Sequence, residues 1–173
     1  LIFETVGQPT VSRPLTLVTL TIDPLPPPAI ASVLSAATYQ PAISPGELVS
    51  IFGAQIGSPP LSGQFDGAGL YPTSLGNTTV TFNGVAAPLL YVSTGQINAV
   101  VPYAVAGQKT VDVVVTHHSQ KSAPFPVLVM DTSPGIFTVG QNGGGQGAIL
   151  NVRSNSLATL NSVVNPAPIG SYI

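Results

Sequence analysis

The only two histidines of the chain, His117 and His118, are adjacent and could in principle bind a metal or exchange protons. Imidazole nitrogens are common metal ligands and titrate near neutral pH. In an extended strand, however, neighbouring side chains point to opposite faces, so the pair cannot easily chelate one ion. Because the segment 117–120 also separates two apolar runs, we expect an exposed hairpin turn here rather than a metal site.

The carboxylates are too scattered along the sequence to predict a catalytic pair. The six acidic residues lie in different turns and strands: Glu4, Asp23, Glu47, Asp66, Asp112 and Asp131. Glycoside hydrolysis needs two carboxylates held across one bond, and calcium needs several oxygen ligands. Because the segment 66–69 (Asp-Gly-Ala-Gly) supplies only one acid, we interpret it as a turn.

Other catalytic motifs are absent from the sequence. The chain has no cysteine, which excludes a disulfide, a thiol nucleophile and a Cys-type zinc site. No Gly-x-Ser-x-Gly motif accompanies the serines. The glycine run 143–147 lacks the Lys-Ser/Thr ending of a phosphate-binding loop. We therefore predict no catalytic residue, no cofactor and no metal, and a chain that is not an enzyme.

Tyrosine is the side chain that could contact a sugar by stacking, although tryptophan, the usual platform, is absent. The five tyrosines are Tyr39, Tyr71, Tyr91, Tyr103 and Tyr172. We expect Tyr91 to pack beside Leu89. Residues 54–77 form a long Gly/Pro/Ser-rich segment, and loops of this length are often functional. Tyr71 and Asp66 in this segment are the residues that we expect at a ligand site, if the chain has one.

Composition restricts the partners of the chain. Hydrophobic residues make up 44% of the 173 residues, enough for a packed core, whereas charged residues make up only 6%. With four basic residues and a net charge of −2, the chain has no electrostatic footprint for nucleic acid or anionic membranes. No apolar run is long enough to span a bilayer. A surface of Thr, Ser, Asn, Gln and Gly suits a secreted protein, or one covered by neighbouring copies.

The elements that must hold these residues are short strands. Eighteen glycines and eighteen prolines interrupt the chain along its whole length, and β-branched residues fill the intervals. Only residues 29–38 have some helical character. Asn83-Gly84 is a strong hairpin signal. Six strands are predicted, over 47–53, 78–82, 86–92, 96–102, 108–116 and 122–130. Six short strands with tight turns indicate an all-β sandwich.

Residues 13–22 predict a further strand with no sequence-adjacent partner. Its apolar side chains almost share one face: Leu15, Leu17, Leu20 and Ile22. The prolines that follow, in the segment 23–28, predict a stiff polyproline II spacer rather than a hairpin. Because the chain begins at Leu1 without a basic leader, we interpret it as a processed or excised segment.

Several strings of the sequence resemble a family of C-terminal domains in large secreted proteins of Solibacter-type acidobacteria. They are Pro45-Gly-Glu-Leu-Val-Ser-Ile-Phe-Gly53, Val80-Thr-Phe-Asn-Gly-Val-Ala-Ala-Pro-Leu-Leu-Tyr-Val-Ser93, Gly95-Gln-Ile-Asn-Ala-Val-Val-Pro-Tyr103, Pro134-Gly-Ile-Phe137 and Gly145-Gln-Gly-Ala-Ile-Leu-Asn151. Their order is also similar to the IPT/TIG class of immunoglobulin-like domains. The resemblance implies an immunoglobulin-like β-sandwich, an extracellular setting and no particular reaction.

The resemblance also implies two consecutive repeats. Residues 165–173 echo residues 40–48, the entry to the first repeat, while residues 1–22 are similar to the closing strands of a preceding sandwich. We therefore divide the chain into closing strands of a neighbouring sandwich (1–23), a proline-rich linker (24–34), a sandwich (35–133) and an extension that begins a second repeat (134–173). The terminal strands are expected to belong to a second, composite sandwich.

Two functions from different classes follow. The first is a structural subunit at the cell surface that associates with identical subunits or adjacent domains by strand donation, giving a fibre or a long multidomain chain. Its donor residues would be Leu15, Leu17, Leu20 and Ile22, and its acceptor residues Ile169, Tyr172 and Ile173. The second is an accessory module that binds polysaccharide or another ligand through Tyr71 and Asp66.

Overall fold

The computed structural model describes residues 26–152, 158–171 and 173. The expected donor strand 13–22, with Leu15, Leu17, Leu20 and Ile22, lies outside the described residues, as does Tyr172. Within the described residues, no helix is long and apolar enough to cross a lipid bilayer.

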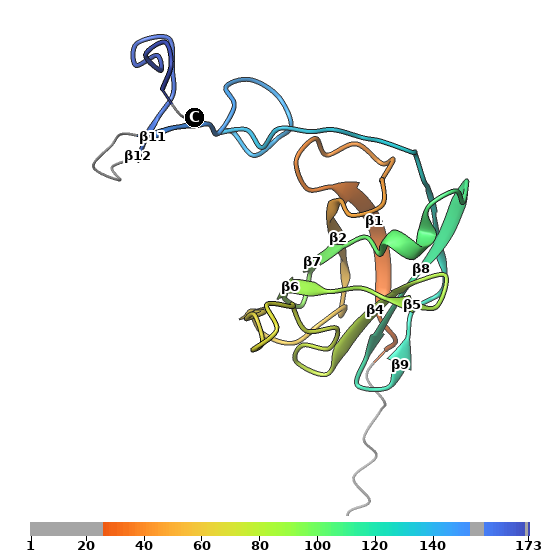
Figure 1. The fold of residues 1–173 in the computed structure, drawn as a ribbon. Coiled ribbons are helices and arrows are strands. Elements are labelled where there is room, and N and C mark those ends of the chain that lie inside the picture. Colours follow the sequence, from red (N-terminus) through yellow and green to blue (C-terminus); the bar gives the residue numbers. More distant parts are fainter. Residues whose placement is uncertain (1–25, 153–157, 172) are drawn as a thin grey trace, which may run out of the picture.

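Two antiparallel sheets contain most of the described strands (Figure 1). The first has the order β1 (Ala29–Ser35), β2 (Leu48–Ala54), β7 (Gln96–Val100), β6 (Leu89–Val92), β3 (Leu61–Ser62). The second has the order β10 (Phe125–Leu128), β8 (Thr110–His117), β4 (Thr78–Phe82), β5 (Val85–Ala86), with β9 (Gln120–Lys121) paired to β8. A short 3₁₀ helix spans Tyr103–Val105, and β11 (Leu150–Val152) pairs with β12 (Ala158–Leu160).

The core lies between the two larger sheets because their strands alternate buried and partly exposed residues. In β4, Thr78, Val80 and Phe82 are buried while the two threonines between them are half-buried. Strand β8 buries Val111, Val113 and Val115 in the same way. The core residues that face them from the first sheet include Val49, Ile51, Leu89, Val92, Ile97 and Ala99. The expected all-β sandwich is therefore confirmed.

The two predicted tight turns form where their residues tolerate a left-handed backbone. Asn83 and Gly84 have φ of 46° and 83° and connect β4 to β5. His118 and Ser119 have φ of 46° and 67° and connect β8 to β9. Two consecutive positive φ angles define the type I′ turn, whose twist matches that of a hairpin.

The predicted strand 86–92 is wrong as a single element, because it divides between the two sheets. Val85 and Ala86 pair with β4, whereas β6 pairs with β7 in the opposite sheet. The chain crosses at Ala87 and Pro88. Proline has no N–H to donate to a continuing ladder, and the Pro88 carbonyl instead accepts a hydrogen bond from Val100 at 2.9 Å. The Asn-Gly signal predicted the turn but not where the second strand would end.

The sandwich begins earlier than the sequence predicted. Residues 29–35, expected to form the end of a linker with some helical character, are strand β1, which pairs antiparallel with β2. Val33 and Ser35 are buried, so the strand contributes to the core. Farther along, Ile43 donates to Leu128 and accepts from Met130, at 3.1 and 2.8 Å, and so joins the edge of the second sheet. This first segment therefore contacts both sheets.

The extension after residue 134 leaves the sandwich and forms a separate small sheet. Figure 1 shows β11 and β12 standing apart from the two main sheets. These two strands pair antiparallel, with Leu150 opposite Leu160 and Val152 opposite Ala158. The turn of this hairpin lies outside the described residues.

Candidate functional site

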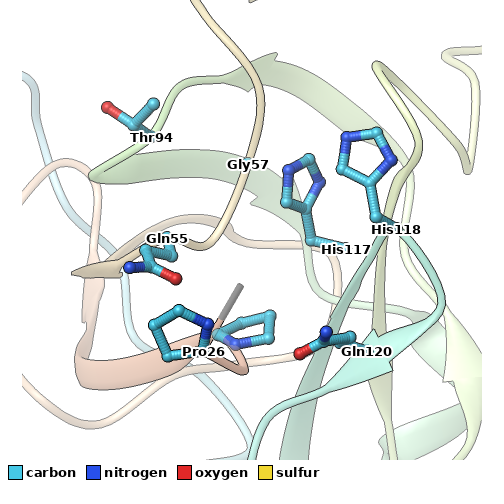
Figure 2. Close-up of a pocket in the computed structure, with 8 residues that line it drawn as sticks. Pro26, Gln55, Gly57, Thr94, His117, His118 and Gln120 are labelled. Carbon is cyan, nitrogen blue, oxygen red and sulfur yellow. The ribbon is translucent and has the colours of Figure 1, made fainter. Parts of the chain in front are cut away.

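The β8–β9 hairpin, which carries His117 and His118, borders a cavity at one end of the sandwich (Figure 2). The cavity has a volume of about 210 Å³ and lies where four segments meet: the chain entering β1, the end of β2, the turn before β7 and the β8–β9 hairpin. Its lining residues are Pro26, Pro28, Gln55, Gly57, Thr94, His117, His118 and Gln120. No carboxylate is among them.

The two histidine rings lie together, which corrects the expectation that they point apart. Their centroids are 4.3 Å apart and the ring planes are inclined at 62°. The expectation assumed an extended backbone at both residues. Because His118 has a φ of 46°, the alternation of a strand ends at His117 and the next side chain turns back beside it.

Thr78 fixes the position of the first ring. Its fully buried hydroxyl lies 2.9 Å from Nδ1 of His117, across the β4–β8 pairing. Burial lowers the pKa of His117 from its usual value, and the nearby His118 lowers it further, while a hydrogen bond to the backbone of Asn77 opposes both. The ring is therefore more readily neutral than an exposed histidine.

The chemistry available at this hairpin is limited. Among the described residues, no group of three or more His, Cys, Asp or Glu is placed to hold a metal ion. Among the described residues that line the cavity, none is a carboxylate that could orient an imidazole as the aspartate of a catalytic triad does. These residues offer hydrogen-bonding groups and a small apolar recess.

The loop 54–77 is held by Asp66. Its carboxylate Oδ1 accepts hydrogen bonds from the backbone N–H groups of Ala68 and Leu70, both at 2.9 Å. The backbone N–H of Asp66 also donates to the Leu70 carbonyl, and the Asp66 carbonyl accepts from the N–H of Gly69. The interpretation of this segment as a turn agrees with the geometry. With Oδ1 occupied by two backbone amides, the carboxylate is placed to shape the loop.

The ring of Tyr71 packs against the ring of Phe65. Its centroid is 4.1 Å from that of Phe65, with the planes tilted by 35°, and Tyr71 is half-buried while Phe65 is exposed. The aromatic surface that this loop offers to a partner is therefore mainly that of Phe65. Sequence reasoning missed Phe65 because only the tyrosines were considered as stacking residues.

The C-terminal hairpin has its apolar side outward. Leu150 faces Leu160 and Val152 faces Ala158 across the pair, so these four side chains share one face. All four are exposed, with 47% of Leu150 and 42% of Leu160 accessible to solvent. The polar residue between them, Asn151, is buried instead.

Asparagines hold the inner side of this hairpin. Nδ2 of Asn151 donates to the carbonyl of Asn165 at 2.8 Å, and its Oδ1 accepts from Asn161 at 2.7 Å. Nδ2 of Asn165 donates to the carbonyl of Leu160 and to the hydroxyl of Thr159. Strand alternation alone could not identify this network, because it does not say which face is covered.

Two of the three expected acceptor residues, Ile169 and Ile173, lie within the described chain. Ile169 is fully exposed and Ile173 is largely exposed, and they follow the hairpin in an irregular segment. The exposed side chains of Val163 and Val164 lie in the same stretch. The extension thus presents many apolar side chains without a cover among the described residues.

Comparison with known proteins identifies the sandwich. The comparison with curated proteins gave no match. The family described as the IPT/TIG domain matches residues 38–127, more than half of the chain and nearly all of the two-sheet sandwich. The fold and this match agree, and the chain belongs to the IPT/TIG domain family.

Proposed function

We propose that this protein is a non-catalytic, extracellular structural module that associates with neighbouring domains or copies through its C-terminal extension. The observation that carries the proposal is the inverted hairpin β11–β12, whose apolar face is exposed while its polar face is buried. An apolar face of this kind is favourable only when another surface covers it.

The free energy of burying apolar side chains favours a partner surface that covers this face. Fully burying a leucine or valine side chain contributes about 1.5–3 kcal/mol. Roughly half of Leu150, Val152 and Leu160 is still exposed, so covering this face would contribute about 3 kcal/mol in total. A two-stranded hairpin alone is marginally stable in water, and each of its strands also has an open edge within the described residues.

The sequence of residues 13–22 supports strand donation as the mode of association. Leu15, Leu17, Leu20 and Ile22 would cover an apolar face, and the proline segment after them would hold the strand away from its own sandwich. A contact between the front of one copy and the back of the next need not close on itself, and so forms a fibre or a row of domains.

Composition and motif order support the setting. A sequence in which only 6% of the residues are charged suits an extracellular protein whose surface is covered by neighbours. The echo of residues 40–48 in residues 165–173 favours a row of repeats in a secreted chain of the acidobacterial type.

The test is the oligomeric state of the full chain by light scattering and negative-stain microscopy. Wild type is expected to form a concentration-dependent series of species. Leu17→Asp should abolish it by placing a charge on the face that we propose is donated, whereas the control Thr16→Asp, which strand alternation would place on the other face, should leave the series intact. A single monomeric mass for wild type, or equal effects of both variants, would refute the proposal.

A further inference from the structure

A groove lies between the outer face of the first sheet and the C-terminal extension. Strands β2 and β7 form its floor, the turn after β1 forms one side, and residues 137–148 form the other. Its volume is about 350 Å³. It is separate from the histidine cavity and from the loop that carries Tyr71, because it shares no lining residue with either.

The floor of the groove is a row of amides with unused hydrogen-bonding groups. Oδ1 of Asn98 accepts from the hydroxyl of Ser50 at 3.2 Å and from Nε2 of Gln96 at 2.9 Å. Among the described residues, these bonds leave the Asn98 Nδ2 donors and the Gln96 Oε1 acceptor free for a partner in the groove. A free donor and a free acceptor on neighbouring amides match hydroxyl groups, which both donate and accept.

Thr138 supplies an independent sign of a missing partner. It lines the groove and is only 9% exposed. Among the described residues, its Oγ1 is the one buried side-chain polar atom with no hydrogen-bond partner. Leaving such a hydroxyl unpaired costs about 1–3 kcal/mol. Because the oxygen itself is buried, a ligand in the groove would gain this bond when the Thr138 side chain rotates toward it.

Two aromatic side chains border the groove on a built scaffold. Tyr39 has a φ of 59°, unusual for a bulky residue, and is held there by the hydrogen bond from its N–H to the Ser35 carbonyl at 3.0 Å. Phe137 comes from the extension, where its carbonyl accepts from Ala148 at 2.7 Å. Tyr39 and Phe137 thus both offer apolar surface to the groove that contains the amides.

The extension must approach the sandwich closely to make this groove. A Cβ on Gly143 would lie 2.2 Å from the carbonyl oxygen of Thr38, so only glycine permits the contact. Figure 1 shows the loop of the extension beside the turn that follows β1. The groove therefore depends on a contact between Thr38 and Gly143, which are more than 100 positions apart in the sequence. For this reason no local sequence motif predicted the groove.

We propose that this groove binds a neutral saccharide of one or two sugar rings. Among the described residues that line it, none carries a carboxylate, an imidazole or a cationic group, which favours an uncharged ligand. The amides and the Thr138 hydroxyl match sugar hydroxyls, and the rings of Tyr39 and Phe137 match the apolar faces of pyranoses. The volume lies within the range of small-molecule sites. The site does not depend on assembly of the chain.

Isothermal titration of the full chain with cellobiose, maltose, lactose and xylobiose tests the proposal, with digalacturonate as a charged comparison. At least one neutral disaccharide should bind, and more tightly than digalacturonate. Asn98→Ala should weaken that binding roughly tenfold. Gln141 also lines the groove and is exposed, and its φ of 50° suits glycine. Gln141→Gly should therefore weaken binding several-fold, and it serves as a second variant in case Asn98→Ala misfolds.

Two controls and one stability measurement complete the test. Tyr71→Ala and His118→Ala should leave the affinity unchanged. Thr138→Val should weaken binding and raise the melting temperature of the free protein, because it removes an unpaired buried hydroxyl. The proposal is overturned if no neutral disaccharide binds, if digalacturonate binds as tightly, if His118→Ala abolishes binding, or if Thr138→Val lowers the melting temperature.

Discussion

Replacing Leu150 and Leu160 together by serine should weaken self-association by a calculable amount. These residues face each other across β11–β12 and are 47% and 42% exposed. If burial of a whole leucine contributes about 1.5–3 kcal/mol, burial of the remaining half contributes about 1 kcal/mol for each. The double variant should therefore lose about 2 kcal/mol of association free energy, or roughly 25-fold in the dissociation constant.

Sedimentation equilibrium over a concentration series measures this change directly. The matched control is Leu61→Ser, because Leu61 is also 42% exposed but lies on β3 of the sandwich. Its dissociation constant should stay within about twofold of wild type. Equal association of the double variant and wild type, or an equal loss in the control, would show that the inverted hairpin is not the associating surface.

Three further results are expected. Phe82→Ala should lower the free energy of unfolding by about 3–5 kcal/mol in urea denaturation, because Phe82 is fully buried between the sheets; a loss below 1 kcal/mol would contradict this packing. Because the pKa of His117 is lowered in the fold, stability should be full above about pH 6.5 and fall as the pH drops toward that lowered value. His117→Gln should flatten this dependence in urea titrations across pH, and an unchanged slope would contradict it. Asp66→Ala should speed amide exchange at Ala68 and Leu70, whose N–H groups donate to the carboxylate; unchanged protection would show that other contacts hold the loop.

The elements of the sandwich could be predicted where the signal is local. Asn83-Gly84 and the segment 117–120 form turns because their residues tolerate positive φ, which depends on the residue type itself. The alternation in β4 and β8 likewise follows from one buried face. The resemblance to IPT/TIG domains, read from ordered short strings, also agrees with the family match.

The sequence predicted less accurately those elements whose structure depends on a segment far away in the chain. Residues 29–35 became a strand because β2 offers an edge, which their own sequence does not encode. The strand expected over 86–92 was divided because Pro88 cannot continue a ladder and β7 accepts the residues after it. His117 and His118 were expected apart, and one positive φ brought their rings together.

The sequence by itself determined the class of this protein: short apolar strands, glycine and asparagine turns, few charges and no cysteine allow little other than a β-sandwich. Only the tertiary structure decided which faces are covered. In the C-terminal hairpin it buries Asn151 and exposes Leu150. It also brings Thr138 and Asn98 into the lining of one groove. Alternation along a strand defines two faces, but which of them meets a neighbour depends on chain segments far away in the sequence.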